Sequence, residues 1–264
     1  MSTLDIQRQA HPNGVLAHVW LNRPTLRNAF NDDTIAELTQ AFTSLGQDPR
    51  VRAIVLGAHG QAFSAGGDLN WMRAMADYSW EENHGDAARL AAMLWAIAHC
   101  PVPVIARIQG DCYGGGVGLV AACDVAVATD NAGFCLSEVK LGLIPGTISP
   151  YVIRAIGERA ARRYFVTAER FDAQRALALG LLHEVCPPDA LDDTVNAIAH
   201  AIMANGPLAV RASKQLVADV AGVPLTAELR DQTARCIADI RASDEGRAGL
   251  QAFLNKTTPP WQVA

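Results

Sequence analysis

The stretch over residues 110–145, GDCYGGGVGLVAACDVAVATDNAGFCLSEVKLGLIP, restricts the fold more than any other part of the chain. Glycines 114 to 116 stand at the start of an apolar run that predicts a helix. The first N–H groups of a helix have no partner within it, and glycines leave them open to a docking anion. Glu138 follows in an apolar segment ending at Pro145, and a carboxylate among apolar residues is a candidate acid or base. The stretch predicts a site that holds an oxyanion and moves a proton.

Short apolar runs elsewhere predict buried strands that alternate with helices. The expected strands are Val15–Leu21, Ala53–Gly57, Val104–Ile108, Asp124–Ala128 and Leu181–Val185, the last one following a helix that stops at Gly180. Asn31 or Asp32 is expected to cap a helix whose apolar face carries Ile35, Leu38, Phe42 and Leu45. This alternation favours an α/β architecture.

The last third of the chain has a different pattern. Residues 189–204, 207–220, 225–240 and 243–255 are predicted to be helical, and no strand pattern returns. These helices carry more apolar side chains than a small domain can bury, at Leu216, Val217, Val220, Ile237 and Ile240. We therefore expect an assembly surface here.

Composition narrows the classes of partner. A net charge of −5 disfavours nucleic acid and anionic membranes as main partners. The six cysteines form no C-x-x-C pair and sit mostly in apolar runs, which predicts packed free thiols. The histidines lack metal-ligand spacing, and there is no signal peptide or long apolar span, so we expect a cytoplasmic protein without a metal site.

The glycine stretch has two other interpretations. Residues 116–121 fit G-x-G-x-x-A, a dinucleotide-binding pattern, but the loop after the strand ending at Ile108 is too long for the tight turn that this motif needs. The glycines could also serve only close helix packing. A second loop, AFSAGGDL at 62–69, carries Gly66 and Gly67, which permit an outward N–H group in the same way.

The order of these segments is more specific than any one of them. LNRPTLRNAF (21–30), AFSAGGDL (62–69), the glycine helix (114–122), ACDVAVA (122–128) and SEVKLGLIPG (137–146) follow one another at these spacings, and SDEGRAGLQAFLNKTTP stands near the C-terminus. This set resembles the crotonase family, the enoyl-CoA hydratase/isomerase superfamily, over essentially the whole chain.

The resemblance implies a fold and an assembly. It implies a spiral of ββα units over residues 1–190, carrying the acyl-CoA site, and a helical C-terminal region over 191–264 for oligomerisation and for covering CoA. Such proteins form homotrimers, often paired into hexamers. No cofactor is implied beyond the coenzyme A that is part of the substrate.

The resemblance also assigns roles to residues. The thioester carbonyl would lie between the backbone N–H groups of Gly67 and Gly115, with Glu138 as general acid and base. The positions that correspond to CoA contacts are Thr25, Leu26, Arg27, Ala65, Asp68 and Leu69, together with Phe253 and Lys256, which would reach the CoA of a neighbouring subunit.

One departure from the family pattern bears on mechanism. Hydratases of this family use two glutamates, and the position of the first is Gly118 in this chain. The pattern therefore favours a one-carboxylate mechanism. Hydration of a 2-enoyl-CoA is the leading interpretation, with a Δ3,Δ2-enoyl-CoA isomerase and a non-catalytic acyl-CoA binder as alternatives. Asp111 fits either a structural or a functional role.

Two segments suggest a subgroup. GGDLNWMRAMADYSWEE (66–82) and GLIPGTISPYVIRAIGERAARRYF (142–165) look like the methylglutaconyl-CoA hydratase group of bacterial leucine and acyclic-terpene catabolism, including isohexenylglutaconyl-CoA hydratase-like members. Those substrates carry a second carboxylate, for which Arg73 and Arg154 are candidate cations, although either fits a solvated surface arginine. Trp71, Met72, Met75 and Tyr78 are expected to line the acyl pocket or to form an ordinary packed helix face.

Overall fold

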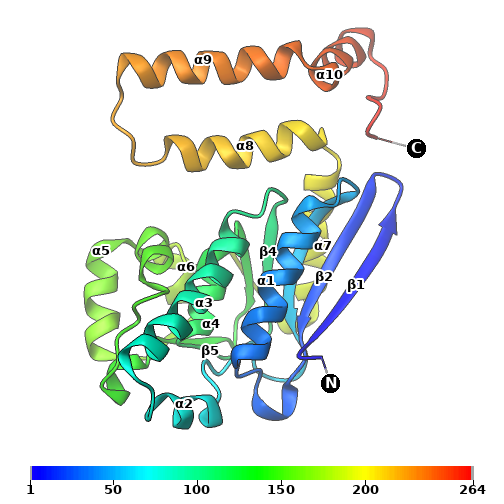
Figure 1. Ribbon diagram of the computed structural model, residues 1–264. Helices are drawn as coiled ribbons and strands as arrows, with labels where there is room; N and C mark the ends of the chain where they lie inside the picture. Colours follow the sequence, from blue (N-terminus) through cyan, green and yellow to red (C-terminus); the bar gives the residue numbers. More distant parts are fainter. Residues whose placement is uncertain (1, 263–264) are drawn as a thin grey trace.

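The computed structural model describes residues 2–262 and shows an α/β body with a helical arm (Figure 1). The larger of two sheets has six strands in the order β1-β2-β3-β4-β6-β9. β1 and β2 are antiparallel, and the other neighbours are parallel. Its strands are β1 (Leu4–His11), β2 (Gly14–Leu21), β3 (Val51–Ala58), β4 (Val104–Ile108), β6 (Val125–Thr129) and β9 (Glu184–Cys186).

A smaller sheet lies next to the glycine-rich segment. It pairs β5 (Cys112–Tyr113) in parallel with β7 (Gly133–Cys135), and β7 in antiparallel with β8 (Phe171–Asp172). The predicted helix after the glycines is confirmed as α4 (Gly115–Ala122). Because β5 and β7 flank α4, this sheet fixes where that helix begins.

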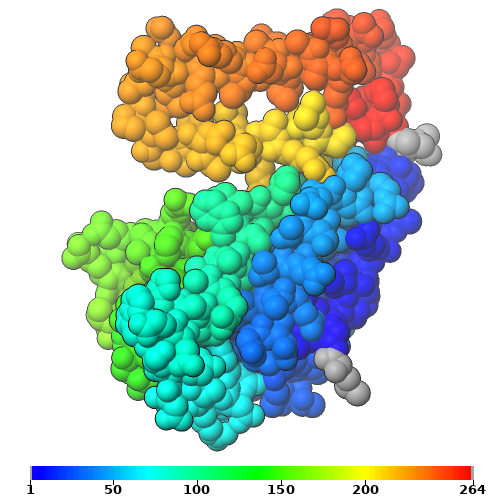
Figure 2. Space-filling model, viewed as in Figure 1, coloured from blue at the N-terminus to red at the C-terminus, as the bar shows by residue number. Residues whose placement is uncertain are grey.

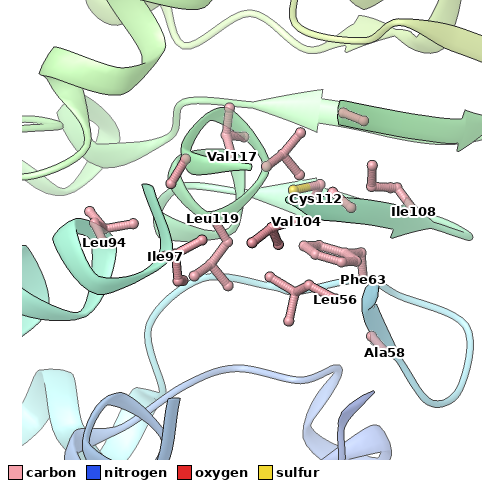
Figure 3. Packing of buried hydrophobic residues seen from close by; sticks show 14 of the residues in the cluster. Leu56, Ala58, Phe63, Leu94, Ile97, Val104, Ile108, Cys112, Val117 and Leu119 are labelled. Atoms are coloured by element: carbon pink, nitrogen blue, oxygen red, sulfur yellow. The ribbon is translucent and has the colours of Figure 1, made fainter. Parts of the chain in front are cut away.

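Helices cover both faces of the larger sheet. On one face α1 (Asp32–Gln47) and α3 (Trp80–Ala98) pack over the main core, part of which Figure 3 shows, with Leu94 and Ile97 of α3 against Leu119 of α4. On the other face α7 (Leu191–Met203) packs against β2, β3, β4 and β6. The body also contains α2 (Leu69–Met75), α5 (Ser149–Thr167) and α6 (Ala173–Leu179). Short 3-10 turns η1 (Pro24–Leu26), η2 (Glu138–Leu141) and η3 (Pro188–Ala190) link these elements.

The helix expected after Asn31 or Asp32 is confirmed as α1, with its cap and its buried face. The Asn31 side chain accepts a hydrogen bond from the Thr34 N–H, which satisfies one of the free donors of the first turn. Ile35, Leu38, Phe42 and Leu45 are all buried. Cys100, Cys112 and Cys135 are buried free thiols, as expected.

One strand expectation needs correction, and one strand was not predicted. The strand expected at Leu181–Val185 begins only at Glu184, because the N–H groups of Leu181 and Leu182 both bond back to Ala176 O and close the end of α6. β1 gave no sequence signal. It is an edge strand whose only buried residue is Leu4, so it has no apolar alternation.

The arm consists of α8 (Pro207–Val220), α9 (Ala227–Ala242) and α10 (Asp244–Asn255). In Figure 2 a gap separates the arm from the light-green part of the body, and an opening lies between the yellow and orange helices of the arm. Polar contacts fasten α8 to the body: Lys214 Nζ lies 2.6 Å from Asp124 Oδ2, and Arg211 donates to the carbonyls of Gly46, Asp48 and Val51. Within residues 2–262, no helix combines the length and the apolar character needed to cross a membrane.

Candidate active site

Backbone hydrogen bonds bring the two glycine loops together. The Tyr113 N–H donates to Ser64 O at 2.9 Å, and the Ser64 N–H donates to Asp111 O at 3.2 Å. The Phe30 N–H in turn donates to Gly66 O at 2.9 Å. Segments 28–30, 63–68 and 111–115 thus lie side by side, although about eighty residues separate the first from the last.

Two of the glycines are required by backbone conformation. Gly66 has a φ of +87° and Gly114 a φ of +52°, in a region that residues with a side chain rarely adopt. A Cβ at Gly66 would also lie 3.1 Å from Tyr113 O, so the close approach of the loops needs a residue without a side chain. These conformations set the direction of the N–H groups that follow, at Gly67 and Gly115.

The N–H groups of Gly67 and Gly115 have no hydrogen-bond partner among residues 2–262. Gly115 is the first residue of α4, so its N–H points away from the helix and carries the positive end of the helix dipole. Both glycines are half-buried. Two free N–H donors on adjacent loops can hold one oxyanion.

Glu138 completes this group from the start of η2. Its Oε1 lies 3.4 Å from the point where a Cβ on Gly114 would stand, so the carboxylate is next to the N-terminus of α4. Its Oε2 is buried and has no hydrogen-bond partner among the described residues. Burial raises the pKa of Glu138 above its ordinary value, because the charged form loses hydration without gaining a cation. This is the environment of a carboxylate that can act as a general acid and base.

Ile148 fills the space in front of Gly118. A side chain at position 118 would collide with the Ile148 side chain, whose Cβ would be only 2.8 Å from the new Cβ. Ile148 is buried, with 2% of its surface exposed, and β-branched residues have little rotational freedom. The side of α4 at Gly118 is therefore apolar rather than ionised. The sequence signalled Gly118 but not this partner.

The first set of predicted CoA positions lies around η1 and the loop before α2. Thr25 and Arg27 line a groove of about 680 Å³ together with Asp111 and Arg170. Asp111 accepts hydrogen bonds from both arginines, at 3.0 Å from Arg27 and 2.6 Å from Arg170. Leu26 is half-exposed and Leu69 is exposed. The Ala65 N–H is used in a bond to Arg27 O.

Asp68 has structural partners for its carboxylate. It accepts from the N–H groups of Asn70 and Trp71, which caps α2, and from Arg23 at 2.8 Å. Burial alone would raise the pKa of Asp68, but the Asn70 N–H and the Arg23 guanidinium lower it below its ordinary value. Arg23 was not predicted from the sequence, and neither was Asn28, whose φ of +53° was signalled only by asparagine's tolerance of that conformation.

Phe253 and Lys256 are not brought to this site within one chain. Both belong to the end of α10, which lies at the opposite end of the molecule from α2 and β5 (Figure 1). Phe253 is 81% exposed.

The residues predicted for the acyl pocket and its distal end divide into two groups. Trp71 and Met72 have atoms 3.5 Å from the point where a Cβ on Gly67 would stand, so both cover that glycine. Arg73 is exposed on α2 and donates to Asn70 Oδ1. Arg154 lines a separate cavity of about 340 Å³ with Tyr151 and His183.

Comparison with known proteins gives a consistent result. The family model for enoyl-CoA hydratase/isomerase matches residues 11–263. A crystal structure from Legionella pneumophila, assigned to enoyl-CoA hydratase/isomerase (crotonase), is 46% identical with a TM-score of 0.91, covering 99% of this chain and 100% of that one. An enoyl-CoA hydratase from Shewanella pealeana is 40% identical with a TM-score of 0.94, covering 98% and 96%. The 2,3-dehydroadipyl-CoA hydratase of Escherichia coli is 31% identical, covering 99% of each chain. The crotonase fold expected from the sequence is confirmed.

Proposed function

The chain belongs to the enoyl-CoA hydratase/isomerase family, and we propose that it hydrates a 2-enoyl-CoA thioester at the site of Gly67, Gly115 and Glu138. The observation that carries this proposal is the pair of free N–H groups next to a buried carboxylate with an unpartnered oxygen. The hydratase names of the relatives support the same reaction class.

The two N–H groups act on the thioester carbonyl. Attack of water on the β-carbon moves electrons through the conjugated double bond onto the carbonyl oxygen and forms an enolate. Gly67 and Gly115 donate to that oxygen, and the dipole of α4 adds to the stabilisation. Loss of one such donor typically costs about 3 kcal/mol of transition-state stabilisation.

Glu138 moves the proton in both directions. As a carboxylate it takes a proton from the attacking water, and as the neutral acid it returns that proton to the α-carbon when the enolate collapses. Water then adds to one face of the double bond, with no net change in the protonation of the enzyme. A raised pKa suits this double role, because the neutral acid must form readily after the first transfer.

The Gly118–Ile148 contact supports the one-carboxylate scheme. Ile148 leaves no room for a second carboxylate on this face of α4, so both transfers are left to Glu138. The same contact favours a second candidate function, a Δ3,Δ2-enoyl-CoA isomerase, in which Glu138 would carry a proton from one carbon to another and no water is needed.

We propose that the acyl group is a branched dicarboxylate of the 3-methylglutaconyl type, which would place the enzyme in leucine or related fatty-acid catabolism. The name of the E. coli relative supports this class, since a dehydroadipyl group also ends in a carboxylate. Arg73 and Arg154 remain the candidate cations for the distal carboxylate. Replacing each by glutamine separates them: the correct variant loses 3-methylglutaconyl-CoA turnover and keeps crotonyl-CoA turnover.

We propose a homotrimer or dimer of trimers in the cytoplasm, in which Phe253 and Lys256 of one subunit approach the CoA of the next. The exposed Phe253 and the distance of α10 from the site in its own chain support this arrangement (Figure 1). We also propose that no metal or redox cofactor takes part, so dialysis against EDTA is expected to leave activity unchanged.

One assay tests the reaction class. The protein is incubated separately with crotonyl-CoA, with 3-methylglutaconyl-CoA and with a 3-enoyl-CoA, and absorbance of the conjugated enoyl thioester is followed. A hydratase removes this absorbance, an isomerase creates it from a 3-enoyl-CoA, and a non-catalytic binder changes neither. Absence of turnover with all of these thioesters would contradict the proposal.

A further inference from the structure

Two aromatic rings pack against the two glycines that carry the free N–H groups. A Cβ on Gly115 would collide with the Phe30 ring, and ring atoms Cε3 and Cζ3 of Trp71 lie 3.5 Å from a Cβ on Gly67. The two ring centroids are 6.4 Å apart with planes at 50°. This separation and tilt are typical of an interacting aromatic pair. The pair forms an apolar wall that joins the two donors.

Trp71 is held by a carboxylate from another helix. Its Nε1 donates to Asp86 Oδ1 on α3 at 3.2 Å, and Arg89 donates to the same oxygen at 2.9 Å. Asp86 is only 4% exposed, and a buried carboxylate is stable only when it is hydrogen-bonded. The hydrogen bond from the indole N–H therefore has two effects. It gives the buried Asp86 carboxylate a partner, and it fixes the plane of the Trp71 ring.

Little else holds the helix that carries Trp71. α2 has seven residues and none of them is buried. A helix of this length is not stable by itself in water. Its attachments are the Asp68 cap at its start and the side chains of Trp71 and Met72, which pack at Gly67. The position of α2 over the site thus depends on the Trp71–Asp86 bond more than on its own helical structure.

We infer that Trp71 is a specificity-determining residue that contacts the acyl group next to the thioester, and that Asp86 is a positioning residue that acts through Trp71. A thioester whose oxygen is held by Gly67 and Gly115 lies within van der Waals reach of the Trp71 ring. An acyl chain gains contact with that ring, whereas free CoA does not. This inference rests on the proposed function for the placement of the thioester.

The experiment compares the affinities of butyryl-CoA and free CoA by calorimetry, because the saturated thioester binds without reacting. In the wild type, butyryl-CoA is expected to bind more tightly. Trp71→Phe and Asp86→Ala should each reduce this preference about three- to tenfold and leave the affinity for free CoA unchanged. Asp86→Asn should keep the wild-type preference, because the amide oxygen still accepts the indole N–H.

Trp80→Phe is the matched control. Trp80 lies at the start of the same α3, is 72% exposed and stacks on His84 away from Gly67. It should leave both affinities and the melting temperature unchanged. Trp71→Phe should lower the melting temperature slightly, because the buried Asp86 carboxylate then keeps Arg89 but loses the indole N–H. The deciding measurement is therefore the ratio of the two affinities, which a loss of stability alone would not change.

Three outcomes of the affinity measurements would contradict the inference or the proposed function. If Trp71→Phe or Asp86→Ala lowers both affinities equally, or changes neither, the inference is wrong. It is also wrong if Asp86→Asn behaves like Asp86→Ala, because a purely ionic role would then explain the residue. If the wild type itself shows no preference for butyryl-CoA, the proposed acyl-CoA function fails, which is a separate result.

Discussion

The body and the arm use apolar residues in opposite ways. In the body, strands such as β3 are buried along their whole length, and the main core includes Val117 and Leu119 of α4 (Figure 3). In the arm, α8 has no buried residue, α9 has only Leu229, and α10 has only Ala252. Its large apolar side chains are exposed instead, with Val217 at 69% and Leu225 at 96%.

This difference separates two tasks. The candidate catalytic groups are backbone donors and one carboxylate, and packing within the body sets their geometry. The arm is fastened by hydrogen bonds and ion pairs rather than by a shared core, and no part of residues 2–262 covers its exposed apolar side chains. We therefore expect chemistry to depend on the body, and assembly to depend on the arm.

The largest expected effect comes from the body. Glu138→Gln should lower turnover by about 10²–10⁴, the range for a general acid–base residue, because the amide cannot take a proton from water. Affinity for CoA should be kept, since the amide preserves shape and the oxyanion donors are backbone groups. Steady-state kinetics with the enoyl-CoA substrate, beside calorimetry with CoA, measures both.

Near-normal turnover in Glu138→Gln would overturn the one-carboxylate scheme. The proton would then have to move through another group, with Asp77, Glu81 or Asp111 as the candidates. Asp111 already accepts bonds from Arg27, Arg170 and the Tyr113 hydroxyl. A fall in turnover together with an equal loss of CoA affinity would instead indicate a distorted site.

The next effect tests the arm. Val217→Asp places a charge on an exposed apolar position of α8 and should convert the proposed trimer to monomers, because burying an unpaired charge in an interface is costly. Ser213→Asp, at an exposed polar position of the same helix, is the control and should leave the assembly unchanged. Sedimentation at micromolar protein measures the mass, and a wild-type monomer would contradict the assembly itself.

Much of the body could be predicted from sequence, for a physical reason. Buried strands and amphipathic helices carry the apolar patterns of a core, so α1, β3 and β4 were expected close to where they lie. The glycines of the two loops were signalled because few other residues adopt their conformations. β1 was missed because an exposed edge strand has no such pattern.

The contacts that tune the site were not visible in the sequence. Trp71 and Asp86 stand on different helices, and each alone is typical of an ordinary helix surface. Ile148 gave no signal for the same reason, since only the packing of α5 against α4 brings it to Gly118. Such pairs depend on the angle and register between elements, which local patterns do not encode.

A smaller effect concerns packing at Gly118. Gly118→Ala should destabilise the protein by about 1–3 kcal/mol, the usual cost of overpacking, because the new methyl group meets the stiff Ile148 side chain. Ile148→Ala in the same chain should remove most of that added cost, so that the two changes are not additive. Thermal unfolding of the two single variants and the double variant measures this coupling.

Gly85→Ala is the control for this prediction. Gly85 lies within α3, and a Cβ there would meet only Arg89 Nη1 at 3.9 Å. It should stabilise by about 0.5–1 kcal/mol, because alanine is the better helix former. If the stability changes of Gly118→Ala and Ile148→Ala simply add in the double variant, the Ile148 side chain moves away from a new methyl group without cost, and the predicted contact is wrong.

The smallest effect returns to Glu138 and concerns stability rather than rate. Because burial raises the pKa of Glu138 in the folded protein, the folded state binds its proton more tightly than the unfolded chain does. The stability that Glu138 contributes is therefore complete below its pKa in the unfolded chain and is lost as pH rises through its pKa in the folded protein.

Above that range the folded protein carries a buried carboxylate with an unpartnered oxygen. Glu138→Gln removes that charge and should raise the stability at pH 8 by about 1 kcal/mol, because burial costs a neutral amide less hydration than it costs a carboxylate. The gain should shrink as pH falls toward 4, where both proteins carry a neutral side chain at this position. Thermal unfolding at several pH values measures it, and a variant less stable than the wild type at pH 8 would show that the carboxylate has a stabilising partner instead.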